Sequence, residues 1–173
     1  DWEEPLHFGS PGVTGTGCGN ELAAKADLVI GVGTRFQDFT TGSWTVFSNP
    51  GRKLLSINIH GYDAHKRAAQ ALVADAKVAL EKIGAALGPH RFPDPDFSAR
   101  TKWFQTTDAL FAAPRGNDLP TDAQVIGAVD RNTGKDSLIM CAAGTMPGAL
   151  HVLWRAAQGG YHMEYGYSCM GYE

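Results

Sequence analysis

The last thirteen residues, Tyr161 to Glu173, hold the densest group of side chains that could do chemistry. They include His162, Glu164 and Cys169 among four tyrosines. Either His162 or Glu164 would suit proton transfer as a general acid or base if a pocket encloses it. A buried strand with aromatic packing, a satisfied core histidine and a structural thiol is the alternative. The residue types alone leave both interpretations open.

A turn of small residues forms a second candidate site. It runs through Ala142, Ala143, Gly144, Thr145 and Met146, after a short apolar strand and before a helix. Backbone amides at a helix N-terminus, with a hydroxyl beside them, suit an oxygen of a diphosphate. Many strand-to-helix turns carry small residues only to pack closely, so the pattern also fits a structural turn.

Four glycines near the start, Gly12, Gly15, Gly17 and Gly19, suggest a dinucleotide-binding loop. No strand is predicted before them, and Asn20 stands where a fingerprint that starts at Gly15 requires its third glycine. The second predicted strand also ends without the acidic residue that grips a ribose. We therefore interpret these glycines as a structural turn.

The loop from Thr34 to Trp44 follows the carboxyl end of a predicted strand, where open parallel sheets place ligands. The alternative is a packed connection in which Arg35 and Asp38 pair and the aromatic residues cover the sheet edge. Composition favours this packed connection, because surface loops of this kind are common.

Predicted strands and helices, which must position these residues, alternate along the first half of the chain. Strands are predicted at residues 28–33, 53–59 and 71–73, after a helix that ends near Lys25. A helix follows over residues 76–87, with apolar residues at Val78, Leu80, Ile83 and Leu87. The first strand has the continuous apolar character of a buried parallel strand. The pattern predicts an α/β fold, with a parallel sheet flanked by helices in a Rossmann-like central domain.

The second half begins after a proline-rich stretch, residues 89–120, which we predict to be a linker with one helix over residues 97–112. Thr121 and Gln124 form a capping box that starts the next helix, which ends near residues 132–134. A strand at 137–141, a helix through Trp154 and a candidate strand at 161–167 follow.

About 50 residues with one or two strands are too few to bury a core of their own. We therefore predict part of a central domain at residues 1–88, the linker at 89–120, and an incomplete second α/β domain at 121–173. The chain starts with Asp1 rather than methionine, and we expect it to be part of a longer protein.

Composition narrows the class of protein. The 173 residues carry a net charge of -3 with no basic stripe, which argues against nucleic-acid binding. No apolar run is long enough to span a membrane and no secretory signal precedes the first strand, so we expect a cytoplasmic globular protein. Three widely spaced cysteines and the scattered histidines indicate reduced thiols and no structural metal site.

Two runs, Arg35 to Trp44 and His162 to Glu173, resemble the corresponding runs of the trihydroxycyclohexane-1,2-dione hydrolase family. Further similarity runs from residues 12–15 through Trp44 and includes residues 72–76 and 141–148, so the resemblance covers nearly the whole chain, with the linker as its least distinctive part. It implies a thiamine-diphosphate-dependent enzyme that opens a cyclic dione to 5-deoxy-glucuronic acid in myo-inositol breakdown. It also implies three domains, of which this chain holds the middle one and the start of the diphosphate-binding domain.

The resemblance implies cofactor contacts in both candidate sites. Gly144, Thr145 and Met146 occupy the diphosphate-contacting loop, although related acetolactate-synthase-like enzymes have Gln-His in place of Thr145 and Met146. In the terminal stretch, Met170 matches the bulky residue that supports the bent cofactor. The other implied contacts there are Gly166, Ser168 and Cys169, of which the last two lie beside the aminopyrimidine. His162 and Glu164 become candidates for proton transfer or for binding substrate hydroxyls.

Other parts of such an enzyme lie outside this chain. The resemblance places the activating glutamate in the missing pyrimidine-binding domain and the Mg²⁺ motif beyond Glu173, so the fragment is expected to be inactive. The middle domain is expected to hold no FAD, since it lacks a ribose acid. The family binds its cofactor between two chains, which implies a homodimer or homotetramer.

A cofactor bound between two chains leads to the hypothesis that the loop Arg35 to Trp44 reaches the active site of a neighbouring subunit. The hypothesis is to be dropped if Gln37→Ala and Asp38→Ala leave the turnover of the full enzyme unchanged. Two alternatives remain: a carboligase of the acetolactate synthase type, and a structural or binding module without catalysis.

Overall fold

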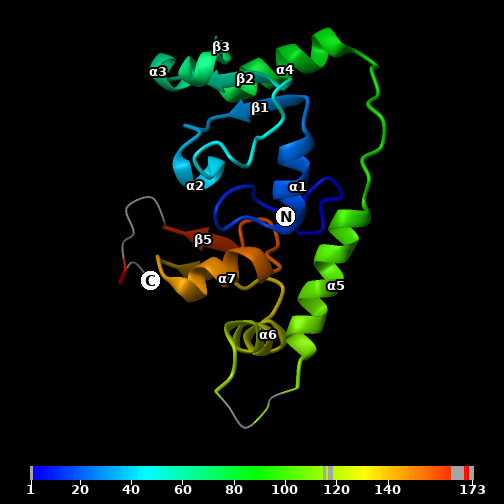
Figure 1. Ribbon diagram of the computed structural model, residues 1–173, viewed down its shortest axis with the longest axis vertical. Helices are drawn as coiled ribbons and strands as arrows, with labels where there is room; N and C mark the ends of the chain where they lie inside the picture. Colours follow the sequence, from blue (N-terminus) through cyan, green and yellow to red (C-terminus); the bar gives the residue numbers. More distant parts are fainter. Residues whose placement is uncertain (1, 115, 117–118, 165–169, 172–173) are drawn as a thin grey trace. The chain divides into compact units, whose positions relative to one another are not determined.

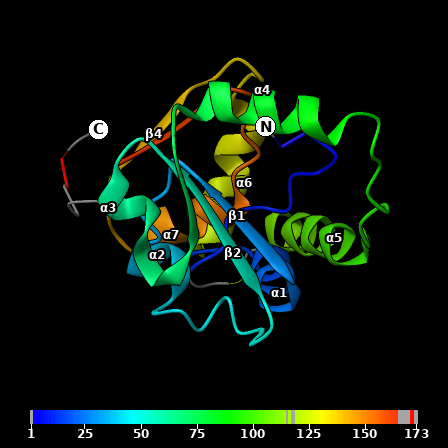
Figure 2. The same ribbon diagram turned by 90° about the horizontal axis from the view of Figure 1, so that it is seen from above.

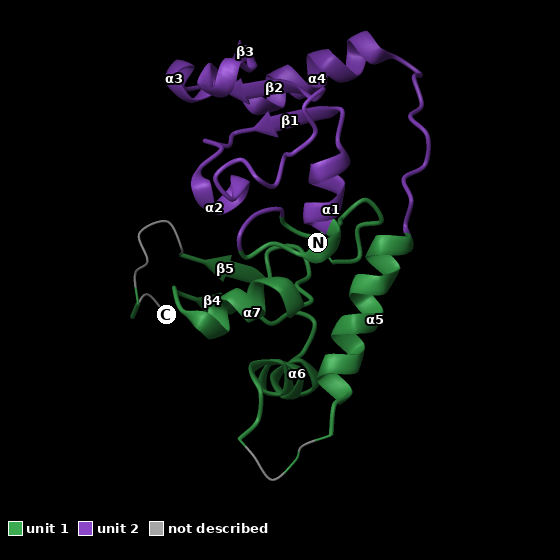
Figure 3. Ribbon diagram, in the orientation of Figure 1, with its two compact units in different colours: residues 1–10, 14–18, 98–173 green, residues 11–13, 19–97 purple. Residues whose placement is uncertain are grey.

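The computed structural model describes residues 2–114, 116, 119–164 and 170–171. Its ribbon is shown in Figure 1. The chain divides into two compact units, coloured in Figure 3. Unit 1 comprises residues 1–10, 14–18 and 98–173, and unit 2 comprises residues 11–13 and 19–97. The domain boundaries drawn from the sequence at residues 88 and 120 stay a prediction.

Unit 2 is built on a parallel sheet of three strands, β1 (Leu28–Val32), β2 (Lys53–Asn58) and β3 (Gln70–Val73), in the order β1-β2-β3. Leu28 lies opposite Lys53, and Leu55 lies opposite Gln70. Figure 2 shows β1 and β2 side by side. The helix α1 (Gly17–Lys25) precedes β1, and α4 (Ala76–Leu87) follows β3. Parallel strands joined through helices confirm the predicted α/β class.

The helix α4 has the bounds that its sequence predicts. Asp75 caps its start, since its carboxylate accepts a hydrogen bond of 3.0 Å from the amide of Val78. Three shorter segments were not predicted, because a single turn has no periodicity to detect. These are α2 (Asp38–Thr41), α3 (Gly61–Ala64) and a 3-10 turn (Lys66–Ala68).

The expectation that β1 is buried on both faces is wrong for this structure. Leu28, Ile30 and Val32 are 40 to 50% exposed, and Gly31 is the buried residue of the strand. Alternate residues of a strand point to the same face, so these three side chains share one face of the sheet. Within the described part of the chain, nothing covers this face enough to bury it.

Unit 1 contains α5 (Ser98–Ala112), α6 (Asp122–Asn132), β4 (Ile139–Cys141), α7 (Thr145–Leu153) and β5 (Tyr161–Met163). The predicted capping box at the start of α6 is confirmed: the Thr121 hydroxyl accepts from the Gln124 amide, and the Gln124 side chain accepts from the Thr121 amide. The strands β4 and β5 are parallel, with Met140 opposite His162.

Unit 1 has a small apolar core, made by Phe111, Ile126, Cys141, Leu150 and Leu153. It therefore joins α5, α6, α7 and β4. The helices α5 and α6 approach closely at Gly127, where an added Cβ would overlap the ring of Phe111. No helix in the described residues is long and apolar enough to cross a membrane.

Candidate functional site

The turn that precedes α7 lies at the carboxyl end of β4. Gly144 is the N-cap residue, with a φ of 151° and no side chain to cap the helix. Thr145 and Met146, the first two helical residues, are exposed. Among the described residues, no protein acceptor takes the amide protons of Thr145 or Met146. The turn therefore presents two free donors at a helix N-terminus.

These donors are suited to an anion. Amides at a helix start carry partial positive charge, and the Thr145 hydroxyl adds a donor at the same place. Pro147, the third helical residue, has no amide proton, and the Gly148 amide lies 3.4 Å from the Gly144 carbonyl. The free donors are thus confined to Thr145 and Met146, which fits a diphosphate oxygen held at this turn.

The strand β5 places its alternate residues on opposite faces of the two-stranded sheet. Tyr161 and Met163 pack against the apolar core, so His162 lies on the other face and is exposed. The Tyr161 hydroxyl lies 3.4 Å from the Cys141 sulfur and donates to the Met163 sulfur at 3.3 Å. These contacts between the side chains at the core fix which face His162 occupies.

Glu164 lies at the same edge of the sheet as the turn before α7. Its amide donates to the Cys141 carbonyl at 3.1 Å, which extends the pairing of β4 and β5 by one bond. Its side chain is half-buried. Because Glu164 follows β5 and Gly144 follows β4, and the two strands are parallel, the topology brings this carboxylate and the free amides to one edge.

The remaining predicted contacts in the terminal stretch fall mostly outside the described residues. Gly166, Ser168 and Cys169 are among the residues that are not described. Met170 is described and is 81% exposed. The predicted role of this stretch in cofactor binding therefore stays a prediction.

The loop that follows β1 is packed by its aromatic side chains. Phe36 and Phe47 are buried, and Trp44 lies between 5.7 and 6.0 Å from them, measured between ring centres. No ion pair joins Arg35 to Asp38 within the described residues, so that detail of the packed-connection alternative is wrong. The aromatic packing itself agrees with a connection that covers the sheet edge.

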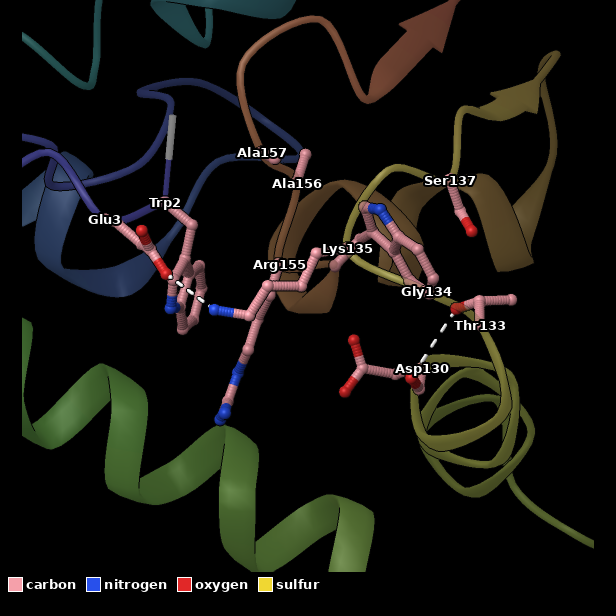
Figure 4. Close-up of a pocket in the computed structure, with 11 residues that line it drawn as sticks. Trp2, Glu3, Asp130, Thr133, Gly134, Lys135, Ser137, Arg155, Ala156 and Ala157 are labelled. Atoms are coloured by element: carbon pink, nitrogen blue, oxygen red, sulfur yellow. Dashed lines mark hydrogen bonds and ion pairs between the residues drawn. The ribbon is translucent and has the colours of Figure 1, made fainter.

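The structure places a separate pocket of about 420 Å³ in unit 1, shown in Figure 4. Trp2, Glu3 and Lys135 contribute to its lining, and the Lys135 ammonium lies 3.3 Å from the Glu3 carboxylate. Ser137 and Ala157, which also line it, precede β4 and β5 respectively. The pocket therefore lies at the opposite edge of the sheet from the turn before α7, and it is not the predicted cofactor site.

Two residues of α5 that the sequence analysis did not single out make long-range hydrogen bonds within unit 1. The Trp103 indole donates to the Val152 carbonyl at 3.0 Å, which ties α5 to the last turn of α7. The Arg100 guanidinium donates to the His7 carbonyl at 2.9 Å. No pattern in the sequence marks these bonds, because their partners are about 50 and 93 residues away.

No group of three or more His, Cys, Asp or Glu side chains that could hold a metal ion occurs among the residues the structure describes.

Comparison with known proteins supports the family resemblance. Residues 1–83 match the family model described as thiamine pyrophosphate enzyme, central domain. The match covers most of unit 2 and none of the elements from α5 onward.

Individual relatives extend the similarity to nearly the whole chain. The chain is 39% identical over 194 residues to the 3D-(3,5/4)-trihydroxycyclohexane-1,2-dione hydrolase of Geobacillus thermodenitrificans, covering 98% of this chain and 30% of that protein. It is 34% identical over 197 residues to the protein of the same name from Clostridium perfringens, covering 98% and 31%. The Bacillus anthracis protein of that name is 37% identical over 198 residues, again covering 98% and 31%. The chain thus spans less than a third of the length of these relatives.

Proposed function

We infer that this chain is part of a thiamine-diphosphate-dependent carbon-carbon bond hydrolase, because residues 1–83 match the model of the central domain of thiamine pyrophosphate enzymes. The proposed substrate is trihydroxycyclohexane-1,2-dione, which is opened to 5-deoxy-glucuronic acid in myo-inositol degradation. The observation that carries this proposal is 34 to 39% identity, over nearly the whole chain, to proteins named for that activity.

The turn before α7 is the proposed contact for the cofactor's diphosphate. The free amides of Thr145 and Met146 and the Thr145 hydroxyl would donate to its oxygens, and Gly144 leaves the approach open. Thiamine diphosphate, when bound, supplies the nucleophilic carbon that allows the bond between the two carbonyl carbons to break. The amides of a helix start need no reorganisation to bind an anion, so this turn is preorganised for that role.

The proposed proton-transferring groups are Glu164 and His162. Glu164 shares the sheet edge with the turn before α7, which supports a role for its carboxylate in exchanging a proton with groups bound there. His162 is exposed on the face opposite the core, where it would bind a substrate hydroxyl. Gly166, Ser168, Cys169 and Met170 are proposed to contact the aminopyrimidine end.

The remaining features of the proposed enzyme concern the longer protein. We propose that Mg²⁺ accompanies the diphosphate through ligands outside this chain, that the enzyme is a cytoplasmic homodimer or homotetramer, and that the 173-residue chain alone has no turnover.

Product analysis on the complete protein distinguishes this proposal from its alternatives. The protein encoded by the complete gene is incubated with thiamine diphosphate and Mg²⁺, and with either trihydroxycyclohexane-1,2-dione or pyruvate. Mass spectrometry should detect 5-deoxy-glucuronic acid from the dione and no acetolactate from pyruvate. Acetolactate formation would establish a carboligase instead. A native mass near 18.5 kDa in the source cells, detected with an antibody to this chain, would leave a structural or binding module.

A further inference from the structure

A cavity of about 440 Å³ in unit 2 is lined by three cationic side chains, Arg52, Lys53 and Arg67. Gln70 is a further polar residue of the lining, which contains no carboxylate. Lys53 begins β2 and Gln70 begins β3, so the cavity lies at the amino-terminal edge of the three-stranded sheet. This is the opposite edge from the carboxyl ends where open α/β sheets usually bind ligands. The cavity is therefore distinct from a nucleotide site of the usual kind.

Two of the cations are held against one aromatic ring. The guanidinium carbons of Arg52 and Arg67 lie 5.7 and 5.1 Å from the centre of the Trp44 ring. Both groups remain charged at any ordinary pH, because a guanidinium does not lose its proton in proteins. Their mutual repulsion is therefore permanent, and a bound anion would relieve it.

The carboxylates that the structure describes do not neutralise these cations. Within the described residues, none of Arg52, Lys53 and Arg67 forms an ion pair. Asp27, whose carbonyl accepts from the Lys53 amide at 2.7 Å, forms none either. One Arg52 amino group donates to the Asn49 carbonyl at 2.9 Å, which fixes the side chain and leaves its other donors available.

The backbone is strained at two residues that line the cavity and at Trp44, which lies outside the lining. Arg67 and Ala68 have left-handed φ values of 58° and 54°, and Trp44 has a φ of 70°. Residues other than glycine rarely adopt such values, because their Cβ atom then lies too close to the backbone. Strain of this kind persists where the surrounding structure requires it, which is often at a binding site. Arg67, one of these strained residues, both contacts the indole and lines the cavity.

We propose that this cavity binds a phosphate group, either as inorganic phosphate or as the phosphate monoester of a small metabolite. Guanidinium groups offer paired donors that match phosphate oxygens, and the lysine adds a third positive charge. The volume is in the range of small-molecule sites. The cofactor's diphosphate is assigned to the turn before α7, so this second anion site is independent of the proposed catalytic function.

Calorimetric titration of the complete protein, with thiamine diphosphate and Mg²⁺ already bound so that the turn before α7 is occupied, tests the proposal. Inorganic phosphate and glucose 6-phosphate are titrated separately, with sodium chloride added to hold the ionic strength constant. Saturable binding of one equivalent, with a dissociation constant of about 1 mM or lower, is expected for at least one probe. Tighter binding of the ester identifies a metabolite site, and binding of inorganic phosphate alone identifies a site for the free ion. Absence of saturable binding for both probes overturns the proposal.

A matched pair of variants separates a specific site from general attraction. Arg52→Gln with Arg67→Gln should weaken binding by at least about tenfold, because it removes both charged donors. Lys77→Gln with Lys82→Gln changes the net charge equally on the exposed face of α4 and should change the affinity less than about twofold. Equal losses in both variants would contradict the proposal.

A third variant covers the case in which the arginine pair is needed for folding. Circular dichroism establishes whether each variant is folded, and Lys53→Gln replaces an exposed side chain without touching the Trp44 stack. Lys53→Gln should weaken binding by about threefold or more. Unchanged affinity in this folded variant contradicts the role of the three cations.

Discussion

Asn20 holds both backbone polar groups of Gly12. Its side-chain oxygen accepts from the Gly12 amide at 2.7 Å, and its side-chain nitrogen donates to the Gly12 carbonyl at 3.0 Å. Gly12 has a φ of 124° and lies against the carbonyl of Phe39, so a side chain would not fit there. The residue that breaks the dinucleotide fingerprint is thus the residue that fixes the glycine turn in place.

Replacing Asn20 by alanine should lower the free energy of unfolding by about 1–3 kcal/mol, because the Gly12 amide and carbonyl both lose a partner in a partly buried site. Urea unfolding followed by circular dichroism measures the change. Asn132→Ala is the control, since Asn132 bonds one exposed carbonyl on its own helix, and its effect should stay below about 0.5 kcal/mol. Equal effects of the two changes would contradict the assigned role of Asn20.

Gly127→Ala should destabilise the chain by about 1–3 kcal/mol, because the added methyl group overlaps the ring of Phe111 between α5 and α6. The matched control is Gly84→Ala on α4, where nothing lies within 4 Å of the added carbon. That change should stabilise the chain by roughly 0.5–1 kcal/mol through helix propensity. The opposite signs are checked by urea unfolding, and stabilisation by both changes would argue against the close helix packing.

The sequence predicted the regular parts of the fold better than the environment of its side chains. The helix at residues 76–87 and the capping box at Thr121 are local features, written in periodicity and in residues three apart. The exposure of Leu28, Ile30 and Val32 depends on what covers the sheet, which no local pattern contains.

In the candidate site too, local features were predictable from the sequence and long-range contacts were not. The turn from Gly144 to Met146 was recognisable because a small-residue turn between a strand and a helix has a local signature. The bonds from Trp103 and Arg100 that position α7 and the N-terminal segment join residues distant in the sequence. The short helix at residues 38–41 was missed because its four residues are too few to show a helical repeat.

Lowering the pH should destabilise unit 1 through His151. Burial lowers the pKa of His151 below its ordinary value of about 6.5. The unfolded chain therefore binds a proton first, and stability is retained above about pH 6.5 and lost as the pH falls toward the folded pKa. The pKa of His7 is lowered in the same direction, first by burial and also by the positive charge of Arg100.

Urea midpoints measured between about pH 7.5 and 5.5 test this dependence. The wild-type midpoint should fall, and the fall should be smaller in His151→Gln because one of the titrating groups is gone. His90→Gln, at an exposed position, is the control, and its urea midpoint should fall with pH as that of the wild type does. If the urea midpoint of His151→Gln fell with pH as steeply as that of the wild type, this histidine would be excluded as a cause of the pH dependence.

Thr145→Val in the complete protein should raise the dissociation constant of thiamine diphosphate by about tenfold, because a hydrogen bond to a charged oxygen is lost while the shape is kept. Thr145→Ser should stay within about twofold of the wild type, since the hydroxyl remains. Thr133 lies at the opposite edge of the two-stranded sheet, so Thr133→Val serves as the control that should leave the dissociation constant unchanged. Calorimetric titration of the cofactor measures all three, and equal affinity of Thr145→Val and wild type would remove this turn from the cofactor site.

The cofactor dependence of ring opening tests the proposed function most directly. The complete protein is stripped of cofactor and Mg²⁺, and the consumption of trihydroxycyclohexane-1,2-dione is followed before and after thiamine diphosphate and Mg²⁺ are restored. The proposal predicts no consumption by the stripped protein and formation of 5-deoxy-glucuronic acid once both are present. Equal consumption without thiamine diphosphate, or none with it, would contradict the assignment.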